Sequence, residues 1–504
     1  MAANLDLKIA ATYNEAISGR YFLRTDMIIG RQKELARLER AYTSQQAEFA
    51  VVYGRRRVGK TFLIREYFRQ KACLFVHATG LQKGTLVKQL AHFAESLAQG
   101  FMPGIALKPA KSWDEAFGAL NQLILNDRSE RKIVVFLDEL PWMATRKSGL
   151  LEALDYYWNH FWSGNPRVIL VVCGSSASWL INNIIYNKGG LHNRCTCELK
   201  IDPFVLSETE DFLKSMGVKL NRSHITELYL ALGGIPYYLR YVEPGLTAAE
   251  NIQKILFNKT APLKDEFKKL FMSLFNNADH YIELIKIIAS KKEGVSRMDL
   301  ESLSKKISTG GRLSSRLSNL VQANFIQVFT PFGKKRGEYF KLIDEFCLFY
   351  LYWLLSKKNT QLTPDYWLQQ QNKPAYHAWA GYAFEAVCVK HIDAILKALN
   401  IKTAEAISSW RFMSSELGES GAQIDLLIDR SDEAITLCEI KYTSKPFNID
   451  KSYAAMLQKK IAIFKNKTKT SKHIFLALIC AGGLKESAFV KEYVDQVVIL
   501  DDLF

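Results

Sequence analysis

The chain has 504 residues, 48% of them hydrophobic, so it is long enough for about three domains and apolar enough to give each a core. The N-terminal stretch carries Asp6 and Glu15 and no continuous apolar core, which argues against a secretory signal; the longest apolar run, 346–355, predicts a buried helix because it is too short to span a bilayer. Eight scattered cysteines, of which only Cys195 and Cys197 lie close together, disfavour a zinc site and favour free thiols in a cytoplasmic protein.

The net charge of +16 predicts a polyanionic partner, and the basic residues are concentrated in two places. Residues 254–341 contain 17 Lys and Arg against 8 Asp and Glu, and the segment 451–472 contains seven lysines and no acid. Blocks of one charge are also typical of solvated surfaces, so each block alone leaves both interpretations open. We expect no membrane partner.

The first predicted strand and helix flank a phosphate-binding loop. An apolar run at 49–53 predicts a buried strand, and residues 62–68 predict a helix. Between them, Gly54 to Thr61 fits the pattern G-x-x-x-x-G-K-[ST] at every constrained position. In this order the N–H groups of the loop form an anion nest, and the N-terminus of the helix faces the same phosphates. We therefore expect Lys60 to reach the β- and γ-phosphates of ATP and Thr61 to hold Mg²⁺.

Two acids end the next predicted strand, 132–139. Its continuous apolar run is typical of a parallel strand buried on both faces, and acids at its carboxyl end face the ligand crevice of an open α/β sheet. We expect Asp138 to belong to the Mg²⁺ shell and Glu139 to orient or polarise the attacking water. The alternative is a pair of surface acids that cap a strand end.

Two further polar residues are candidates for the same site. A predicted strand at 168–173 leads to Ser175, which either senses the γ-phosphate through the water or caps the helix that begins near Ala177. Arg194 is a candidate transition-state arginine, acting within its own subunit or on a neighbour in a homo-oligomer. The residues expected to contact the nucleotide from these motifs are Gly54, Arg57, Val58, Gly59, Lys60, Thr61, Phe62, Asp138 and Ser175.

The first half of the chain resembles the prokaryotic archaeal-type ATPases, an AAA+-related, STAND-like branch. The resemblance is carried by the phosphate loop and by three further motifs, which are Ile29-Gly30-Arg31 with Glu34-Leu35, Asp138-Glu139-Leu140-Pro141-Trp142, and Gly233-Gly234-Ile235-Pro236-Tyr237-Tyr238-Leu239. It implies ATP binding and slow hydrolysis, with a helical lid after the α/β core. It also implies that the Gly-Gly-x-Pro turn, with Pro236, lies near the nucleotide. It does not name a substrate.

The first basic segment predicts a winged helix-turn-helix. Helices are expected at 281–290, from Met298 and at 311–324, followed by strands at 325–329 and 339–342. In that arrangement Arg312 and Arg316 lie one turn apart on the recognition helix, and the turn residues Lys334, Lys335 and Arg336 lie on the phosphate backbone of double-stranded DNA. The alternative is a winged helix used only for protein packing.

A second predicted site lies in a β-hairpin with strands at 423–428 and 435–441. Asp425 is a lone acid in an apolar strand, where an unpaired charge is costly. Glu439 and Lys441 are two apart in the second strand, so their side chains share a face. Metal coordination would offset the cost of burying Asp425, whereas charges on an outer sheet face are the simpler explanation.

This hairpin resembles the core of the PD-(D/E)XK nucleases, with Asp425 as the first acid and Glu439-Ile440-Lys441 as the E-x-K motif; Ile424 replaces the proline of the pattern. The resemblance implies Mg²⁺ bound by Asp425, Glu439 and the carbonyl of Ile440, with Lys441 beside the attacking water. It further implies that Glu385 completes the metal shell or acts as base. On the following helix, Lys459 and Lys460 are candidates to hold substrate phosphates. The alternative is an inactive relic that only binds.

Together these patterns predict an α/β protein with a P-loop NTPase core, a helical lid, a winged helix-turn-helix and a C-terminal restriction-endonuclease-like domain. The expected function is DNA processing by an ATP-controlled, Mg²⁺-dependent nuclease. A signalling or scaffold ATPase that does not cut, and a ring-forming DNA motor, are the alternatives. The expected domains are an N-terminal arm (1–25), the ATPase core (26–202), the lid (203–258), the winged helix (259–345), a helical linker (346–375) and the nuclease-like domain (376–504).

Overall fold

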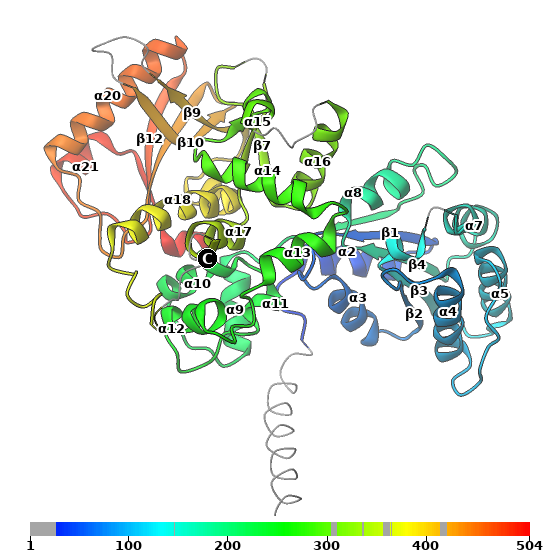
Figure 1. Cartoon of the computed structure of the whole chain (residues 1–504). Coiled ribbons are helices and arrows are strands. Elements are labelled where there is room, and N and C mark those ends of the chain that lie inside the picture. The colour runs from blue at the N-terminus through cyan, green and yellow to red at the C-terminus, as the bar shows by residue number, and fades with distance from the viewer. Residues whose placement is uncertain are drawn as a thin grey trace, which may run out of the picture. The chain divides into compact units, whose positions relative to one another are not determined.

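A computed structural model describes residues 27–145, 147–303, 310–334, 337–355, 363, 365–413 and 421–504 (Figure 1). The predicted N-terminal arm and the predicted DNA contacts Lys335 and Arg336 lie outside these residues. The chain divides after Pro203 into two compact units, which we call the first unit and the second unit.

The first unit is built on a five-stranded parallel sheet in the order β2-β3-β4-β1-β5. The predicted strands at 49–53, 132–139 and 168–173 form and are buried almost throughout, which confirms the predicted parallel α/β core. The position of β4 between β1 and β3 matters for the site, because it brings the end of β4 next to the acids that follow β3. The strands are β1 (Glu48–Tyr53), β2 (Cys73–Thr79), β3 (Lys132–Asp138), β4 (Val168–Gly174) and β5 (Cys197–Lys200).

Helices cover the sheet of the first unit, as the blue and cyan part of Figure 1 shows. The core on the side of α4 and α5 is aromatic: Trp113 is fully buried and packs edge-on against Phe93, while Phe117 packs edge-on against Trp162. The helices are α2 (Gln32–Thr43), α3 (Lys60–Arg69), α4 (Leu86–Phe101), α5 (Trp113–Asn126), α6 (Leu140–Met143), α7 (Leu150–Tyr157) and α8 (Ala177–Leu180).

The second unit begins with short helices in the region predicted as a lid. They are α9 (Leu206–Ser215), α10 (Arg222–Leu232), α11 (Pro236–Leu239) and α12 (Ala248–Ile252). The predicted buried helix at 346–355 forms as α17 (Glu345–Phe349) and continues into the π-helical turn η4 (Tyr350–Leu354). Tyr229 on α10 is fully buried and donates its hydroxyl hydrogen to the carbonyl of Phe204, so the first turn after the unit boundary is tied to this helical layer.

The helices and strands expected of the winged helix also form. They are α14 (Ala278–Ser290), α15 (Arg297–Leu303), α16 (Gly311–Gln322), β7 (Ile326–Phe329) and β8 (Tyr339–Leu342), preceded by α13 (Glu266–Leu274). A short strand that the sequence did not reveal, β6 (Val295–Ser296), pairs with β8 and gives a three-stranded sheet in the order β6-β8-β7. On α16 the residues Leu313, Leu317 and Leu320 are buried, as their helical spacing predicts.

The C-terminal sheet has the order β13-β12-β11-β10-β9, seen as the orange and brown strands in Figure 1. Strands β9, β10 and β11 are antiparallel neighbours, whereas β11, β12 and β13 are parallel. The predicted hairpin is therefore confirmed as β10 with β11. The elements are α18 (Pro374–Lys390), α19 (Ile392–Ala398), β9 (Ala404–Phe412), β10 (Ala422–Arg430), β11 (Ala434–Lys441), α20 (Lys451–Thr468), β12 (His473–Cys480), α21 (Ala488–Tyr493) and β13 (Gln496–Ile499).

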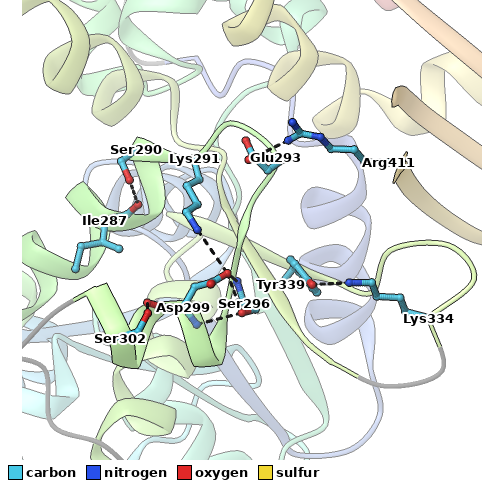
Figure 2. A network of polar contacts seen from close by, with 10 residues as sticks. All are labelled: Ile287, Ser290, Lys291, Glu293, Ser296, Asp299, Ser302, Lys334, Tyr339 and Arg411. Carbon is cyan, nitrogen blue, oxygen red and sulfur yellow. Dashed lines mark hydrogen bonds and ion pairs between the residues drawn. The ribbon is translucent and has the colours of Figure 1, made fainter. Parts of the chain in front are cut away.

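The loop between β7 and β8 packs on this C-terminal sheet. The N–H of Phe332 donates to the carbonyl of Ser409 at 3.2 Å, and the Phe332 ring lies 5.6 Å from the ring of Phe464. Arg411 on β9 pairs with Glu293 at 2.9 Å, as Figure 2 shows. Since β9 is an edge strand with open hydrogen-bonding groups, this contact also covers part of that edge. The segment predicted as a winged helix thus packs on the C-terminal sheet, and both its DNA contact and the alternative of a role in packing alone stay predictions.

Candidate functional sites

The phosphate loop has the backbone that its glycines predict. Gly54 has φ 147° and Gly59 has φ 92°, both in the region that favours glycine. A Cβ on Gly54 would stand 2.2 Å from the carbonyl oxygen of Ile201, so only glycine fits. Arg31 fixes the loop from outside, because its guanidinium donates to the carbonyl of Val58 at 3.2 Å. Arg57 also has positive φ, at 74°.

The two predicted Mg²⁺ residues of the first unit lie together. Thr61 Oγ1 donates to Asp138 Oδ2 at 2.9 Å, although the residues are 77 apart in sequence. Burial alone would raise the pKa of Asp138, but the nearby imidazole of His77 and the hydrogen bond from Thr61 outweigh it and hold that pKa below its usual value. Asp138 is therefore held as a carboxylate, the form that binds Mg²⁺. Lys60 is buried and donates from Nζ to the carbonyls of Gly54 and Arg55, each at 3.0 Å, so its ammonium lies within the loop.

Glu139 and Ser175 form the second contact of this site. The main-chain N–H and the hydroxyl of Ser175 both donate to Glu139 Oε2, at 3.1 and 3.0 Å. Glu139 has φ 51°, a left-handed backbone that is unusual for glutamate. The N-cap position of α8 belongs to Ser176 and carries no side-chain capping bond, so the described contact of Ser175 is with Glu139 and not with the helix.

His77 was not predicted as a site residue. This residue lies near the carboxyl end of β2, beside β3, with Nε2 3.7 Å from Asp138 Oδ2. Its ring stacks on Phe136 at 4.7 Å. A histidine in an apolar strand is typical of a buried core position. The pairing of β2 with β3 is what places His77 beside Asp138.

Three further residues were predicted for this site, and the structure gives their exposure and their place in the chain. Arg194 is exposed and Phe62 is partly exposed at the start of α3. Pro236 is the first residue of α11 and lies in the second unit. The roles assigned to these three residues stay predictions.

Asp425 and Glu439 lie opposite each other in the C-terminal sheet. The register of β10 and β11 pairs Leu426 with Cys438, and the next pair in the same antiparallel register is Asp425 with Glu439. The pairing of β10 with β9 is irregular between Ile424 and Leu427, so Asp425 lies at a bulge, a common way to redirect a side chain. Asp425 Oδ2 accepts a hydrogen bond from the main-chain N–H of Ile440 at 3.1 Å.

Burial and neighbouring charges shift the pKa values of this pair in opposite directions. Burial, followed by the nearby carboxylates of Glu439 and Glu385, raises the pKa of Asp425 to about 7. For Glu439, burial works in the same direction, but the ammonium groups of Lys441 and Lys460 outweigh it and lower the pKa. Lys441 lies 2.9 Å from Glu439 Oε1, and Lys460 lies 2.8 Å from Glu439 Oε2. The site therefore gathers acids and lysines as the sequence predicted.

Glu385 joins this site from α18. Its carboxylate raises the pKa of Asp425, and its Oε2 lies 3.3 Å from the ammonium of Lys341 on β8. Lys341 was not among the predicted site residues, because nothing in its local sequence relates it to Glu385.

The donor atoms at this site fit the predicted Mg²⁺ in part. Asp425 and Glu439 offer hard carboxylate oxygens, the ligands that Mg²⁺ takes, and Ile440, whose carbonyl is the third predicted ligand, directly follows Glu439 in sequence. Over the residues that the structure describes, no group of three or more His, Cys, Asp or Glu side chains gathers closely enough to hold a metal ion. The donor chemistry thus fits Mg²⁺ through two carboxylates and a main-chain oxygen, and Glu385 as a third carboxylate ligand is not supported by this geometry.

The predicted DNA contacts differ in their surroundings. Arg312 is exposed on α16, whereas the guanidinium of Arg316 lies 3.3 Å from His280 Nδ1 on α14. Lys334 donates to the Tyr339 hydroxyl at 2.6 Å, as Figure 2 shows. Lys459 is exposed on α20, one residue before Lys460.

Comparisons with known proteins support the first site. Residues 28–242, somewhat less than half of the chain, match a family model described as an ATPase domain predominantly from Archaea. An uncharacterized protein of Methanocaldococcus jannaschii is 24% identical over 442 residues, which are 86% of this chain and 92% of that protein. An uncharacterized ATP-binding protein of the same organism is 44% identical over 45 residues, which are 9% of this chain and 76% of that protein.

Two solved structures are also similar to this chain. The Walker-type ATPase of Pyrococcus abyssi covers 64% of this chain and 95% of its own, with 19% identity and a TM-score of 0.44. The ORC1 protein of Aeropyrum pernix, solved in complex with DNA, covers 63% of this chain and 90% of its own, with 17% identity and a TM-score of 0.34.

The family match supports ATPase activity with ATP as the nucleotide. It ends at residue 242, so it says nothing of the C-terminal sheet, and the relatives named above lend no support to nuclease activity. Within the described ranges, no helix combines the length and apolarity that crossing a bilayer requires.

Proposed function

We propose that this protein hydrolyses ATP in its first unit and thereby controls a Mg²⁺-dependent DNA nuclease site in its C-terminal sheet. The observation that carries the nuclease half is the register of β10 and β11, which sets Asp425 opposite Glu439 with Lys441 beside them. Burying two carboxylates close together is costly even with lysines beside one of them, so their presence in the sheet calls for a function.

In the first unit each residue of the nucleotide site has a separate role in ATP hydrolysis. Lys60 turns from the loop carbonyls to the β- and γ-phosphates, and Thr61 and Asp138 hold Mg²⁺. Glu139 orients the attacking water, and Ser175 fixes the Glu139 carboxylate through its two hydrogen bonds. Arg194 is assigned to the transition-state charge, and Phe62 and Pro236 to the walls of the nucleotide site.

In the C-terminal sheet Asp425, Glu439 and the Ile440 carbonyl would hold Mg²⁺. The bound ion would stabilise charge on the phosphate oxygens and make water a stronger nucleophile. Lys441 gives up Glu439 as its partner and approaches the scissile phosphate and the water. Glu385 accepts the proton of that water, in keeping with its place beside Asp425.

DNA reaches this site through basic groups of the second unit. Arg312 is exposed on α16, and Lys459 and Lys460 lie on α20, with Lys460 paired to Glu439. Lys334, Lys335, Arg336 and Arg316 are assigned to phosphates of the double-stranded region. Such contacts make affinity fall steeply with salt. Nucleotide state controls cleavage to the extent that ATP and ADP favour different domain arrangements.

The test is incubation with supercoiled plasmid and Mg²⁺, with and without ATP. Wild type should nick or linearise the plasmid, and Asp425→Ala should not, while both hydrolyse ATP equally. Equal background cleavage by wild type and Asp425→Ala under all conditions would sink the nuclease half. Loss of ATP hydrolysis in Lys60→Ala tests the ATPase half separately.

A second candidate is an ATPase switch whose C-terminal sheet binds DNA or protein without cutting. It is favoured by one observation: Lys441 and Lys460 between them pair with both oxygens of Glu439, which neutralises the site without a metal ion. This candidate predicts ATP hydrolysis and DNA binding in EDTA, with no Mg²⁺-dependent cleavage by the wild type.

A further inference from the structure

A cavity of about 450 Å³ opens beside the acids of the C-terminal sheet. Its size falls in the range of about 300–1,000 Å³ that small-molecule sites occupy. The walls come from the end of β9, the start of β10 and one face of α20. The lining falls into an apolar part, which includes Phe412, Met456 and Ile463, and a basic part made of Arg411, Lys459 and Lys460.

Two lining residues connect this cavity with the acids. Lys460 Nζ lies 2.8 Å from Glu439 Oε2, and Gln423 Nε2 lies 3.5 Å from Asp425 Oδ1. A ligand in the cavity therefore lies one side chain away from the candidate metal ligands. If the scissile phosphate binds at Asp425 and Glu439, the neighbouring nucleotide of the same strand would lie in this cavity.

The composition of the walls separates two kinds of DNA. A duplex presents ridges of phosphate and keeps its bases stacked inside, so a basic surface suffices to bind it and an apolar recess gains nothing. An unpaired base can leave the stack, enter a recess and lie against aromatic and methionine side chains while cations hold the flanking phosphates. The contacts with the base would come from Phe412, Met456 and Ile463. The contacts with the flanking phosphates would come from Lys459 and Lys460.

Arg411 is available for a phosphate at the rim. Its described partner is Glu293, at 2.9 Å, and both side chains are more than 40% exposed (Figure 2). Exposed ion pairs of this kind contribute little to stability, so exchanging Glu293 for a phosphate costs little. Among the described residues, the rim thus carries three cations around an apolar interior.

We infer that this cavity receives one unpaired nucleobase with its flanking phosphates, so that the strand bound at the acid site is single-stranded DNA. The inference rests on the DNA-binding half of the proposed function and narrows the duplex expected from the sequence. A duplex would have to open locally before it could occupy the site, at the cost of unstacking.

The test measures binding of the full-length protein in EDTA, without nucleotide, by fluorescence anisotropy. The probes are a labelled single-stranded oligothymidine, an abasic oligomer of equal length and charge, and a duplex of that length. Wild type should bind the oligothymidine about tenfold more tightly than the abasic oligomer, because one stacked base is worth about that factor. Met456→Ser should remove this difference and leave abasic binding unchanged.

Matched variants separate the base from the phosphates. Met272→Ser changes an exposed methionine of α13 and should keep the full preference for thymidine. Lys459→Ala should weaken both single strands alike, and more than Lys465→Ala, which removes an exposed lysine outside the cavity. Circular dichroism melting confirms that each variant is folded.

The outcomes separate this inference from the nuclease. The inference that the cavity receives an unpaired base is wrong if wild type binds the thymidine and abasic oligomers with equal affinity. It is also wrong if wild type binds the duplex more tightly than either single strand. A preference that survives Met456→Ser overturns the cavity as its location. A preference for thymidine that is lost in Met456→Ser and kept in Met272→Ser supports the inference. It does so even if Mg²⁺ produces no cleavage, because that result contradicts only the proposed nuclease activity.

Discussion

Ser175 donates two hydrogen bonds, from its main-chain N–H and its hydroxyl, to one oxygen of Glu139. The contact exists because β4 lies between β1 and β3, so the residue after β4 meets the acid after β3. It leaves the other oxygen of Glu139 available to a water. The pair thus combines a fixed carboxylate with an unusual left-handed backbone at Glu139, as is frequent at functional sites.

Glu139→Gln is expected to reduce the rate of ATP hydrolysis by roughly a hundredfold or more, since positioned acid–base groups contribute about 10²–10⁴. Ser175→Ala should reduce it about tenfold, because the carboxylate remains but loses one of its two donors. Neither change touches the phosphate loop, so binding of a fluorescent ATP analogue should be preserved. Phosphate release and analogue binding measure the two quantities. Loss of analogue binding in Ser175→Ala would show that the serine contacts the nucleotide.

Gly54→Ala should destabilise the first unit far more than Gly104→Ala. Both glycines have positive φ, at 147° and 89°, so each alanine meets backbone strain of about 1 kcal/mol or more. Only Gly54 has a neighbour, the Ile201 carbonyl oxygen, which the new Cβ would meet at 2.2 Å, whereas nothing lies within 4 Å at Gly104. We expect a loss of about 3 kcal/mol or more at Gly54 and about 1 kcal/mol at Gly104. Urea unfolding measures both, and equal losses would contradict the close approach.

Glu227 should make the stability of the second unit depend on pH. Burial raises the pKa of this carboxyl to about 7, and Gln371 donates a hydrogen bond to it that opposes the shift. A carboxyl whose pKa is higher in the folded state stabilises the fold fully below its unfolded pKa, near 4.5, and this contribution is lost as pH rises through 7.

The variant Glu227→Gln removes this titration and keeps an oxygen acceptor for Gln371. It should match wild type near pH 5 and exceed it at pH 8, by up to about 3 kcal/mol for a shift of this size. Denaturant unfolding at the two pH values measures the difference. A difference that does not change between pH 5 and pH 8 would show that Glu227 is ionised in the folded protein.

Local patterns predicted the parts of each site that are contiguous in sequence. The phosphate loop follows from Gly54, Gly59 and Lys60, and the hairpin turn sets the register that brings Asp425 to Glu439. Contacts between distant segments could not be predicted in this way, because they depend on strand order and packing. His77 beside Asp138 depends on β2 pairing with β3. The cavity beside the acids likewise needs α20 to lie against β10.

The contact between Lys341 and Glu385 also joins distant segments and could not be predicted from local sequence. The ammonium of Lys341, from β8 of the winged helix, lies 3.3 Å from Glu385 on α18, and both side chains are largely buried. Lys341→Met removes the partner that holds Glu385 in place near Asp425. If Glu385 acts on the water, the rate of cleavage should fall roughly ten- to a hundredfold in Lys341→Met, because misplacing a reacting group lowers the rate by about that factor. Lys341→Arg keeps the charge and should retain most of the activity.

Lys292→Met is the matched control for this prediction. Lys292 and Lys341 both lie 5.4 Å from the centre of the Tyr382 ring, so each variant loses a cation–π contact with that ring, but the ion pair with Glu385 is made by Lys341. Plasmid cleavage and thermal unfolding are measured on all three variants. Activity that falls equally in Lys292→Met and Lys341→Met would assign the effect to packing of the winged helix against α18. Activity that falls only in Lys341→Met, with a melting temperature like that of the control, makes the winged helix part of the site, because one of its strands then positions a residue that touches the reacting water.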